Sequence, residues 1–176
     1  ISNAEKIITK FKEQNKKLDP KSEQKLIKCA CKGRCSEFLE ILSHLINLDS
    51  YSIPIFVAHY GIINWLDELK KYGVDLAIQD YRFLDEAVNN ADHKFLDKAF
   101  EVIDKVPETV MKRIIKKIIE LDINDMILTI ANLLKFNEKY TNIRLCIDDV
   151  ICNKTSILAF KLFRNNIDND SISKIY

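Results

Sequence analysis

The stretch CACKGRC, residues 29–35, brings three cysteines together, and clustered thiols can bind zinc or carry redox chemistry. Zinc sites typically use cysteine pairs with two or with four residues between them, followed by a second pair farther along. Here Cys29 and Cys31 have one residue between them, which on a helix directs their side chains to nearly opposite sides. Cys31 and Cys35 could share a helix face, but Gly33 weakens a continuous helix. The spacing therefore argues against a metal site.

The other two cysteines, Cys146 and Cys152, lie far along the chain, and the total of five shows no disulfide pattern. We favour the interpretation that the cysteines are small buried hydrophobic residues in a reducing compartment, with a metal site or a reactive thiol as the alternatives. We therefore expect no metal and no cofactor. The expected location is cytoplasmic, or the cytosol of a host cell if the chain is a secreted effector.

Three histidines occur in the chain, and their spacing gives no catalytic or metal-binding pair. No two of His44, His59 and His93 are three or four residues apart, so no helical turn brings two imidazoles to one face. A Cys31–His59 nucleophile pair would lack an orienting third group and oxyanion donors. The few glycines are dispersed, which argues against a phosphate-binding glycine loop. We expect no catalytic residues, no enzyme activity and no small-molecule substrate.

Composition and charge indicate a globular helical chain without a strong electrostatic preference. Of 176 residues, 47% are hydrophobic and 30% are charged, and the net charge of +1 supplies no field that attracts nucleic acid or an anionic membrane. No run approaches the roughly 18 apolar residues of a membrane span. Three Gly and three Pro are too few for the turns of a β-sandwich or barrel. The sequence therefore predicts an all-α fold.

A local cluster of positive charge supports a second function as an alternative. Lys112, Arg113, Lys116 and Lys117 fall on the polar side of an amphipathic helix expected over 110–121. Such a face could bind an anionic membrane or nucleic acid, with an affinity that falls steeply as salt rises. The balanced total charge and the lack of interleaved aromatic residues favour a solvated helix surface instead.

A short pattern recurs along the chain with a period of about 29 residues. Ala-x-x-Gly begins at Ala30 and at Ala58, and Ala-x-x-Asn begins at Ala87. Each occurrence is followed by an aromatic–leucine pair and then by a third apolar position. The pairs are Phe38–Leu39, Trp65–Leu66 and Phe95–Leu96, and the third positions are Leu42, Leu69 and Ala99. Each unit is therefore expected to form a short helix, a tight turn and a second helix.

Stacked helix hairpins give this pattern a physical reason. The small alanine lets the first helices of neighbouring units approach closely, while the aromatic and leucine positions bury the second helix. Gly33, Gly61 and Asn90 are expected to supply the left-handed residue that ends each first helix. Neither helix hides its apolar face alone, so stacking supplies the core. Trp65 is expected in that core.

Residues 53–80, IPIFVAHYGIINWLDELKKYGVDLAIQD, resemble an ankyrin repeat. The first six residues stand where that family has T-P-L-H-x-A, and Gly61 stands at the glycine between its two helices. Gly73, Val74 and Asp75 stand at the G-A-D that opens the next finger turn. A weaker resemblance extends over residues 24–104. It implies an α-solenoid of stacked helix-turn-helix repeats whose partners contact the finger turns and the exposed face of the first helices.

The best-matching repeat departs from the family pattern at three points. Ile53 replaces the threonine and Phe56 replaces the histidine, and both changes remove hydrogen bonds that brace the turn in the family. One residue is also missing before Gly61. We expect this repeat to be looser than a typical ankyrin repeat.

The expected organisation has three parts. Residues 1–20 are expected to be a solvated capping helix, or in part an expression-tag remnant, that ends at Asp19-Pro20. Residues 21–104 hold the ankyrin-like repeats. Residues 105–176 hold further degenerate helical repeats and a C-terminal cap, with one helix at 124–136 and a hairpin over 141–166.

The function expected from these patterns is binding of another protein, as an interaction module and scaffold. The chain could be part of a host-manipulating effector or of a viral protein. Besides binding through the basic helix, a second alternative function is that of a non-catalytic arm of a larger enzyme. Tyr81 and Arg82 are the strongest candidate contacts because tyrosine and arginine are enriched at interface hot spots. The full set of expected contact residues is Phe56, His59, Tyr60, Leu76, Ile78, Gln79, Tyr81, Arg82, Asp85, Glu86 and Asn89.

Overall fold

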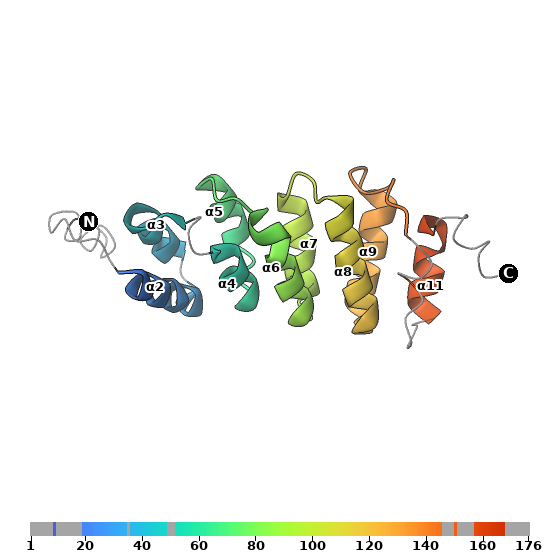
Figure 1. Cartoon of the computed structure of the whole chain (residues 1–176), viewed down its shortest axis with the longest axis horizontal. Coiled ribbons are helices and arrows are strands. Elements are labelled where there is room, and N and C mark those ends of the chain that lie inside the picture. The colour runs from blue at the N-terminus through green and yellow to red at the C-terminus, as the bar shows by residue number, and fades with distance from the viewer. Residues whose placement is uncertain are drawn as a thin grey trace. The chain divides into compact units, whose positions relative to one another are not determined.

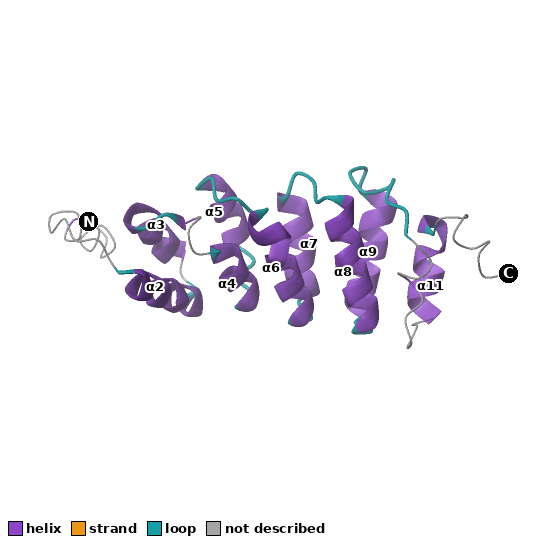
Figure 2. Cartoon of the chain, viewed as in Figure 1, coloured by secondary structure: helices purple, strands orange, loops and turns teal. Residues whose placement is uncertain are grey.

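The structure is a computed structural model that describes Thr9 and residues 19–34, 36–48, 52–145, 150 and 157–167. The regular structure of these residues is helical, apart from one isolated bridge, which confirms the predicted all-α class (Figure 2). In chain order the helices are α2 (Pro20–Gly33), α3 (Ser36–Leu45), α4 (Ile53–His59), α5 (Trp65–Lys71), α6 (Ile78–Asn89), α7 (His93–Val102), α8 (Glu108–Glu120), α9 (Asn124–Phe136), α11 (Ile157–Phe163) and the short 3-10 helix η2 (Arg164–Asn166). None of these helices is long and apolar enough to span a membrane.

The chain divides into two compact units, Ile1–Glu86 and Ala87–Tyr176, and the division falls within α6. The three-part organisation expected from the sequence stays a prediction. The expected capping helix over residues 1–20 and the end of the expected C-terminal cap lie almost wholly outside the described residues.

The first helix of unit 1 starts where the sequence predicted a break. Asp19 is the N-cap of α2, and its carboxylate accepts hydrogen bonds from the backbone N–H groups of Lys21 and Ser22 at 3.0 and 3.1 Å. Pro20 occupies the first helical position, where its missing N–H costs nothing. Hydrogen bonds from the Ser22 side chain and backbone lower the pKa of the Asp19 carboxyl, which keeps this cap ionised.

Unit 1 is built from helix hairpins that lie side by side. Helix α2 packs against α3 within one hairpin, and α4 packs against α5 within the next. Between the hairpins, α2 packs against α4 and α3 packs against α5 (Figure 1). First helices therefore neighbour first helices, and second helices neighbour second helices.

Polar contacts within unit 1 join the end of α2 to the end of α4, and α4 to α6, between residues at nearly constant separations along the chain. Arg34 contacts Tyr60 at a separation of 26 residues, His59 contacts Glu86 at 27, and Gln79 contacts Ser52 at 27. The three contacts thus join neighbouring elements of unit 1 at similar intervals along the chain.

The turns between first and second helices share one hydrogen-bond pattern. After α4, Gly61 donates to Ala58 and Ile62 donates to Val57, at 3.1 and 3.0 Å. These two bonds form a Schellman cap, in which the residue after the helix adopts a left-handed conformation. Gly61 has φ 60°, which confirms the prediction for this turn.

The same cap closes two later first helices, but neither has glycine at the left-handed position. Ala91 follows α6 with φ 53°, and Asp122 follows α8 with φ 51°. The prediction that Asn90 takes this role is therefore wrong by one residue. The bonds place Ala91 there, because its N–H donates to Val88 at 3.0 Å.

The first turn of unit 1 also differs from the prediction. Gly33 lies inside α2, and Arg34 is the left-handed residue, with φ 51° and N–H bonds to Ala30 and Cys31 at 3.1 and 3.3 Å. A glycine tolerates the last helical turn, so the helix continues one residue beyond the expected stop. The left-handed residues after the four first helices thus recur roughly every 30 residues along the chain.

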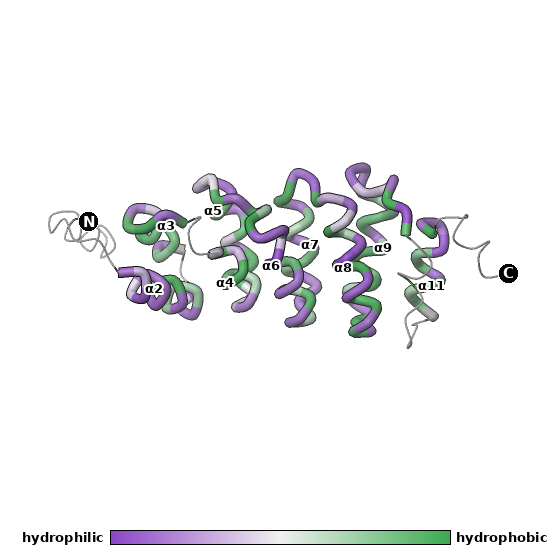
Figure 3. Tube along the Cα trace, in the orientation of Figure 1, coloured by the Kyte–Doolittle hydropathy of each residue, from purple (hydrophilic) through white to green (hydrophobic). Residues whose placement is uncertain are grey.

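Most of the repeated apolar positions are buried, as the pattern predicted. The fully buried set at 0% or 1% exposure comprises Ala30, Ala58, Ala87, Leu39, Leu66, Leu96, Leu42, Leu69, Ala99, Trp65 and Phe95. Figure 3 shows hydrophobic and hydrophilic residues alternating along the helices, as expected of helices with one buried face. The exception is Phe38, which is 42% exposed and lies near Gly33 at the end of α2.

Unit 2 is held by α9, which packs against α7, α8 and α11. Tyr140 is fully buried, and its hydroxyl accepts a hydrogen bond from the Val106 N–H at 3.1 Å. The helix expected from residue 141 onward is not formed at its start, because residues 141–145 make a turn and an irregular segment that ends in a bridge. That bridge is parallel and joins Leu145 to Ile167. Most of residues 146–156 lie outside the described residues.

Candidate partner-binding surface

Of the cysteines at residues 29–35, one lies in the core and another at the surface. Cys31 is fully buried, and burial raises the pKa of its thiol to about 12, so this thiol stays protonated and unreactive. Cys29 is exposed, which corrects the expectation that it is buried. Cys35, Cys146 and Cys152 lie outside the described residues. Within the part of the chain that the structure describes, no three His, Cys, Asp or Glu side chains gather closely enough to hold a metal.

Most of the eleven expected contact residues are at least partly exposed. His59, Gln79, Arg82 and Asn89 are exposed. Phe56, Tyr60, Ile78, Tyr81, Asp85 and Glu86 are half-buried. Leu76 alone among them belongs to the core, at 9% exposure, so little of its side chain could meet a partner.

The structure joins α4 to α6 through two of the expected contact residues. His59 Nδ1 lies 2.7 Å from Glu86 Oε1, a distance for a strong hydrogen bond. The His59 ring also meets the Tyr60 ring edge to face, with centroids 4.9 Å apart. These contacts fix three of the expected residues relative to one another on one exposed surface of unit 1.

Sequence reasoning missed two cationic residues that lie beside this surface. Lys28 Nζ of α2 lies 5.8 Å from the centroid of the Phe56 ring, within the range of a cation–π interaction. Arg34 donates from Nη2 to the Tyr60 carbonyl oxygen at 2.9 Å. Lys28 stands two residues before Ala30, as Phe56 stands two before Ala58, so extending the repeat alignment to the first repeat could have found it.

The finger segment, defined as Gly73–Tyr81, follows α5 and includes the first four residues of α6. It begins with a Schellman cap in which Gly73 has φ 73°. Gln79, Asp80 and Tyr81 then follow in succession with φ 52°, 55° and 59°. Three consecutive left-handed non-glycine residues are unusual, because each Cβ crowds the following carbonyl oxygen.

One side-chain contact ties the finger segment to the start of α4, and a second lies within the segment. Gln79 Nε2 donates to the Ser52 hydroxyl at the start of α4, and Asp75 Oδ1 accepts from the Ala77 N–H at 2.8 Å. Burial, reinforced by the carboxylates of Asp75 and Asp80, raises the pKa of the Tyr81 phenol. The phenol is therefore neutral at physiological pH, and its O–H can donate a hydrogen bond.

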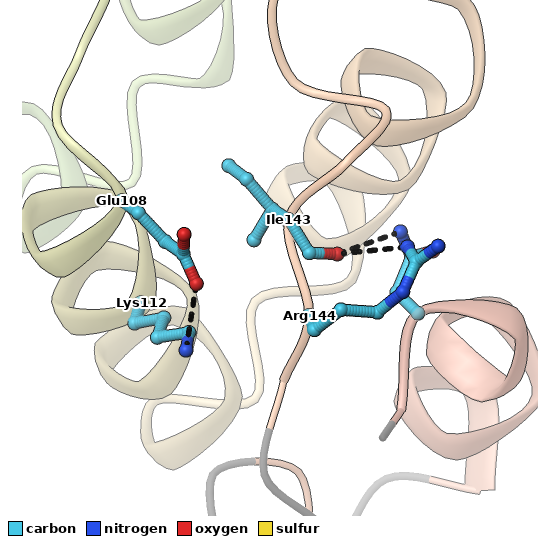
Figure 4. A network of polar contacts seen from close by, with 5 residues as sticks. Glu108, Lys112, Ile143 and Arg144 are labelled. Atoms are coloured by element: carbon cyan, nitrogen blue, oxygen red, sulfur yellow. Dashed lines mark hydrogen bonds and ion pairs between the residues drawn. The ribbon is translucent and has the colours of Figure 1, made fainter. Parts of the chain in front are cut away.

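The basic face of the alternative function lies on α8, which begins at Glu108, two residues earlier than the expected range. Lys112 Nζ lies 2.8 Å from Glu108 Oε1 on the same helix (Figure 4). Arg113 and Lys117 are half-buried, and Lys116 is exposed. The pairing and the burial reduce the positive charge that this helix presents to solvent.

Comparison of the chain with protein-family models, with curated proteins and with solved structures found no match.

Proposed function

We propose that this chain is a protein–protein interaction module built as an α-solenoid of ankyrin-like repeats. The observation that carries the proposal is the regular spacing in unit 1, where polar contacts join the end of α2 to the end of α4, and α4 to α6, at separations of 26 or 27 residues. The recurring left-handed caps and the buried alanines agree with the same architecture. Repeat stacks of this kind typically act by presenting an extended surface.

The binding surface proposed here consists of the exposed side of α4, the finger segment and the start of α6. This surface combines aromatic rings with charged groups. Several of its side chains are held in place by the His59–Glu86, Lys28–Phe56 and Gln79–Ser52 contacts. Side chains that are already ordered lose less conformational entropy on binding. Tyr81 and Arg82 are the proposed hot spots, since Tyr81 ends the finger segment, Arg82 follows it, and both residue types are enriched at interface hot spots.

The membrane or nucleic-acid alternative is not favoured, because Glu108 lies against Lys112 on the basic helix. Binding through that helix would also give an affinity that falls steeply with ionic strength. A protein partner held by the aromatic surface of unit 1 would show a much weaker dependence on salt.

Affinity capture with three baits tests the proposed function. The baits are the chain, a Tyr81→Ala/Arg82→Ala variant, and a Lys71→Ala/Tyr72→Ala variant. The last is a matched control that removes Lys71 at the end of α5 and the tyrosine that follows it, where Lys71 Nζ lies 5.7 Å from the Tyr72 ring centroid. We expect proteins captured by the chain and by the control to be lost with the first variant. Capture that ignores both pairs of substitutions would contradict the proposal.

A further inference from the structure

A cleft in unit 2 concentrates positive charge in a way that the proposed function does not explain. It has a volume of about 490 Å³ and is bounded by α9, by the connection that follows it and by the α11–η2 segment. Lys135, Arg144 and Lys161 line it, one from each of these three elements. The lining contains no carboxylate among the described residues. In a chain with 27 cationic and 26 acidic residues, three cations around one cleft are a marked local imbalance.

The three cations are not neutralised by ion pairs within the described ranges, whereas several other lysines are. Lys71, Lys98 and Lys112 each lie within 3.5 Å of a glutamate on their own helix. Lys135 instead lies over the Phe136 ring, 4.8 Å from its centroid. The Lys135 ammonium group is therefore not paired with a carboxylate of the described residues, and its N–H donors are open to an anionic ligand.

The Arg144 guanidinium is oriented by backbone oxygens and keeps unused donors. Its Nη1 donates to the Thr141 and Ile143 carbonyl oxygens, both at 3.4 Å, and Figure 4 shows it beside the latter. Both distances are long, so neither bond uses much of the donor capacity of this nitrogen. An arginine has five N–H donors in a planar fork, and the remainder match two oxygens of one phosphate group.

The walls of the cleft are held together by the backbone. The Leu145 N–H donates to the Asn166 carbonyl oxygen at 2.7 Å, and the Asn166 side chain donates to the Ile143 carbonyl oxygen at 3.3 Å. Leu134, which also lines the cleft, is buried at 2% exposure. The connection that carries Arg144 and the segment that follows Lys161 are thus fixed to each other before any ligand arrives.

We propose that this cleft binds a small anion that carries at least two phosphate groups. Three cations balance the charge of such an anion, and the neighbouring Asn132 and Asn165 supply neutral donors for its remaining oxygens. The volume falls within the usual range of about 300–1,000 Å³ for small-ligand sites. The phosphates could belong to a free metabolite or to a lipid headgroup, because both present the same chemistry. The site is independent of the surface proposed for partner binding.

Calorimetric titration of the whole chain with inorganic pyrophosphate tests this site. We expect binding that weakens at least about tenfold in Arg144→Gln and in Lys161→Gln, because each loses charged hydrogen bonds to the anion. Lys116→Gln on α8 removes one exposed cation elsewhere in unit 2 and should leave the affinity unchanged. The Tyr81→Ala/Arg82→Ala variant should also bind normally, which separates this site from the partner surface. Urea unfolding of each variant shows whether its fold is intact.

Vesicle co-sedimentation separates the two sources of phosphate. The probe is phosphatidylcholine vesicles with and without phosphatidylinositol bisphosphate. Binding of free pyrophosphate without binding to these vesicles assigns a soluble ligand, and binding to the vesicles that Arg144→Gln abolishes assigns a headgroup. The proposal is overturned if neither probe binds, or if Lys116→Gln weakens binding as much as Arg144→Gln does.

Discussion

Replacing Ala91 by glycine should stabilise the protein, although Ala→Gly changes normally destabilise. Ala91 is the left-handed residue of the Schellman cap after α6, with φ 53°. A Cβ in that conformation costs roughly 1–2 kcal/mol, which glycine does not pay. The greater freedom of glycine in the unfolded chain offsets about 0.4–1 kcal/mol of the gain. The expected net effect is an increase of about 0.5–1 kcal/mol in the free energy of unfolding.

Ala77 supplies a matched control for this substitution. It is exposed and non-helical like Ala91, but it is not among the residues with positive φ. Ala77→Gly should therefore lower the free energy of unfolding by about 0.5–1 kcal/mol, through the entropy of the unfolded chain alone. Asn90→Gly should also fail to stabilise, because Asn90 does not occupy the left-handed position.

Urea denaturation followed by far-UV circular dichroism measures all three variants, with equal m-values as the check that the surface exposed on unfolding is unchanged. The two Ala→Gly variants should move the midpoint in opposite directions. If Ala91→Gly destabilises as much as Ala77→Gly, the left-handed cap after α6 is refuted. If Asn90→Gly is the stabilising variant, the cap lies where the sequence alone had placed it.

Further predictions concern the core and the thiols. Ala58→Leu should lower the free energy of unfolding by about 1–3 kcal/mol in urea titrations, because the fully buried Ala58 has no room for a larger side chain. Tyr140→Phe should lower the free energy of unfolding by about 1–3 kcal/mol in the same assay, because it leaves the Val106 N–H buried without its partner hydroxyl. An unchanged midpoint would show that this hydrogen bond does not stabilise the fold. Iodoacetamide should alkylate Cys29 in the folded chain and should not alkylate Cys31 until urea is added. Fragment-ion mass spectrometry can distinguish the two sites. Equal labelling of the two thiols in the folded chain would contradict the burial of Cys31.

The buried positions of the repeat could be predicted from sequence because the type of each residue indicates whether it is buried. An alanine followed by an aromatic–leucine pair at a fixed period has few uses other than close helix packing, and Ala58, Trp65 and Leu66 are buried as expected. The caps were harder to predict, because hydrogen-bond geometry and not glycine content selects the left-handed residue. Arg34 and Ala91 take that conformation despite their Cβ atoms.

Contacts between separate elements left no local signal in the sequence. The Lys28–Phe56 pair depends on how one hairpin registers with the next, and neither residue type indicates the other. The cationic cleft brings together Lys135, Arg144 and Lys161, which are too far apart along the chain to form a visible basic motif. The basic residues that are close together in the sequence lie on α8, where Lys112 is paired with Glu108.

The affinity of a captured partner for the variants of unit 1 tests the central claim most directly. The partner would be titrated against the chain, against Tyr81→Ala/Arg82→Ala and against Lys71→Ala/Tyr72→Ala, after circular dichroism has shown that all three are equally helical. The proposed surface predicts that the first variant loses about 2 kcal/mol or more of binding, roughly thirtyfold in Kd, while the control binds as the chain does. Equal affinities for all three, or a loss confined to the α5 variant, would contradict it.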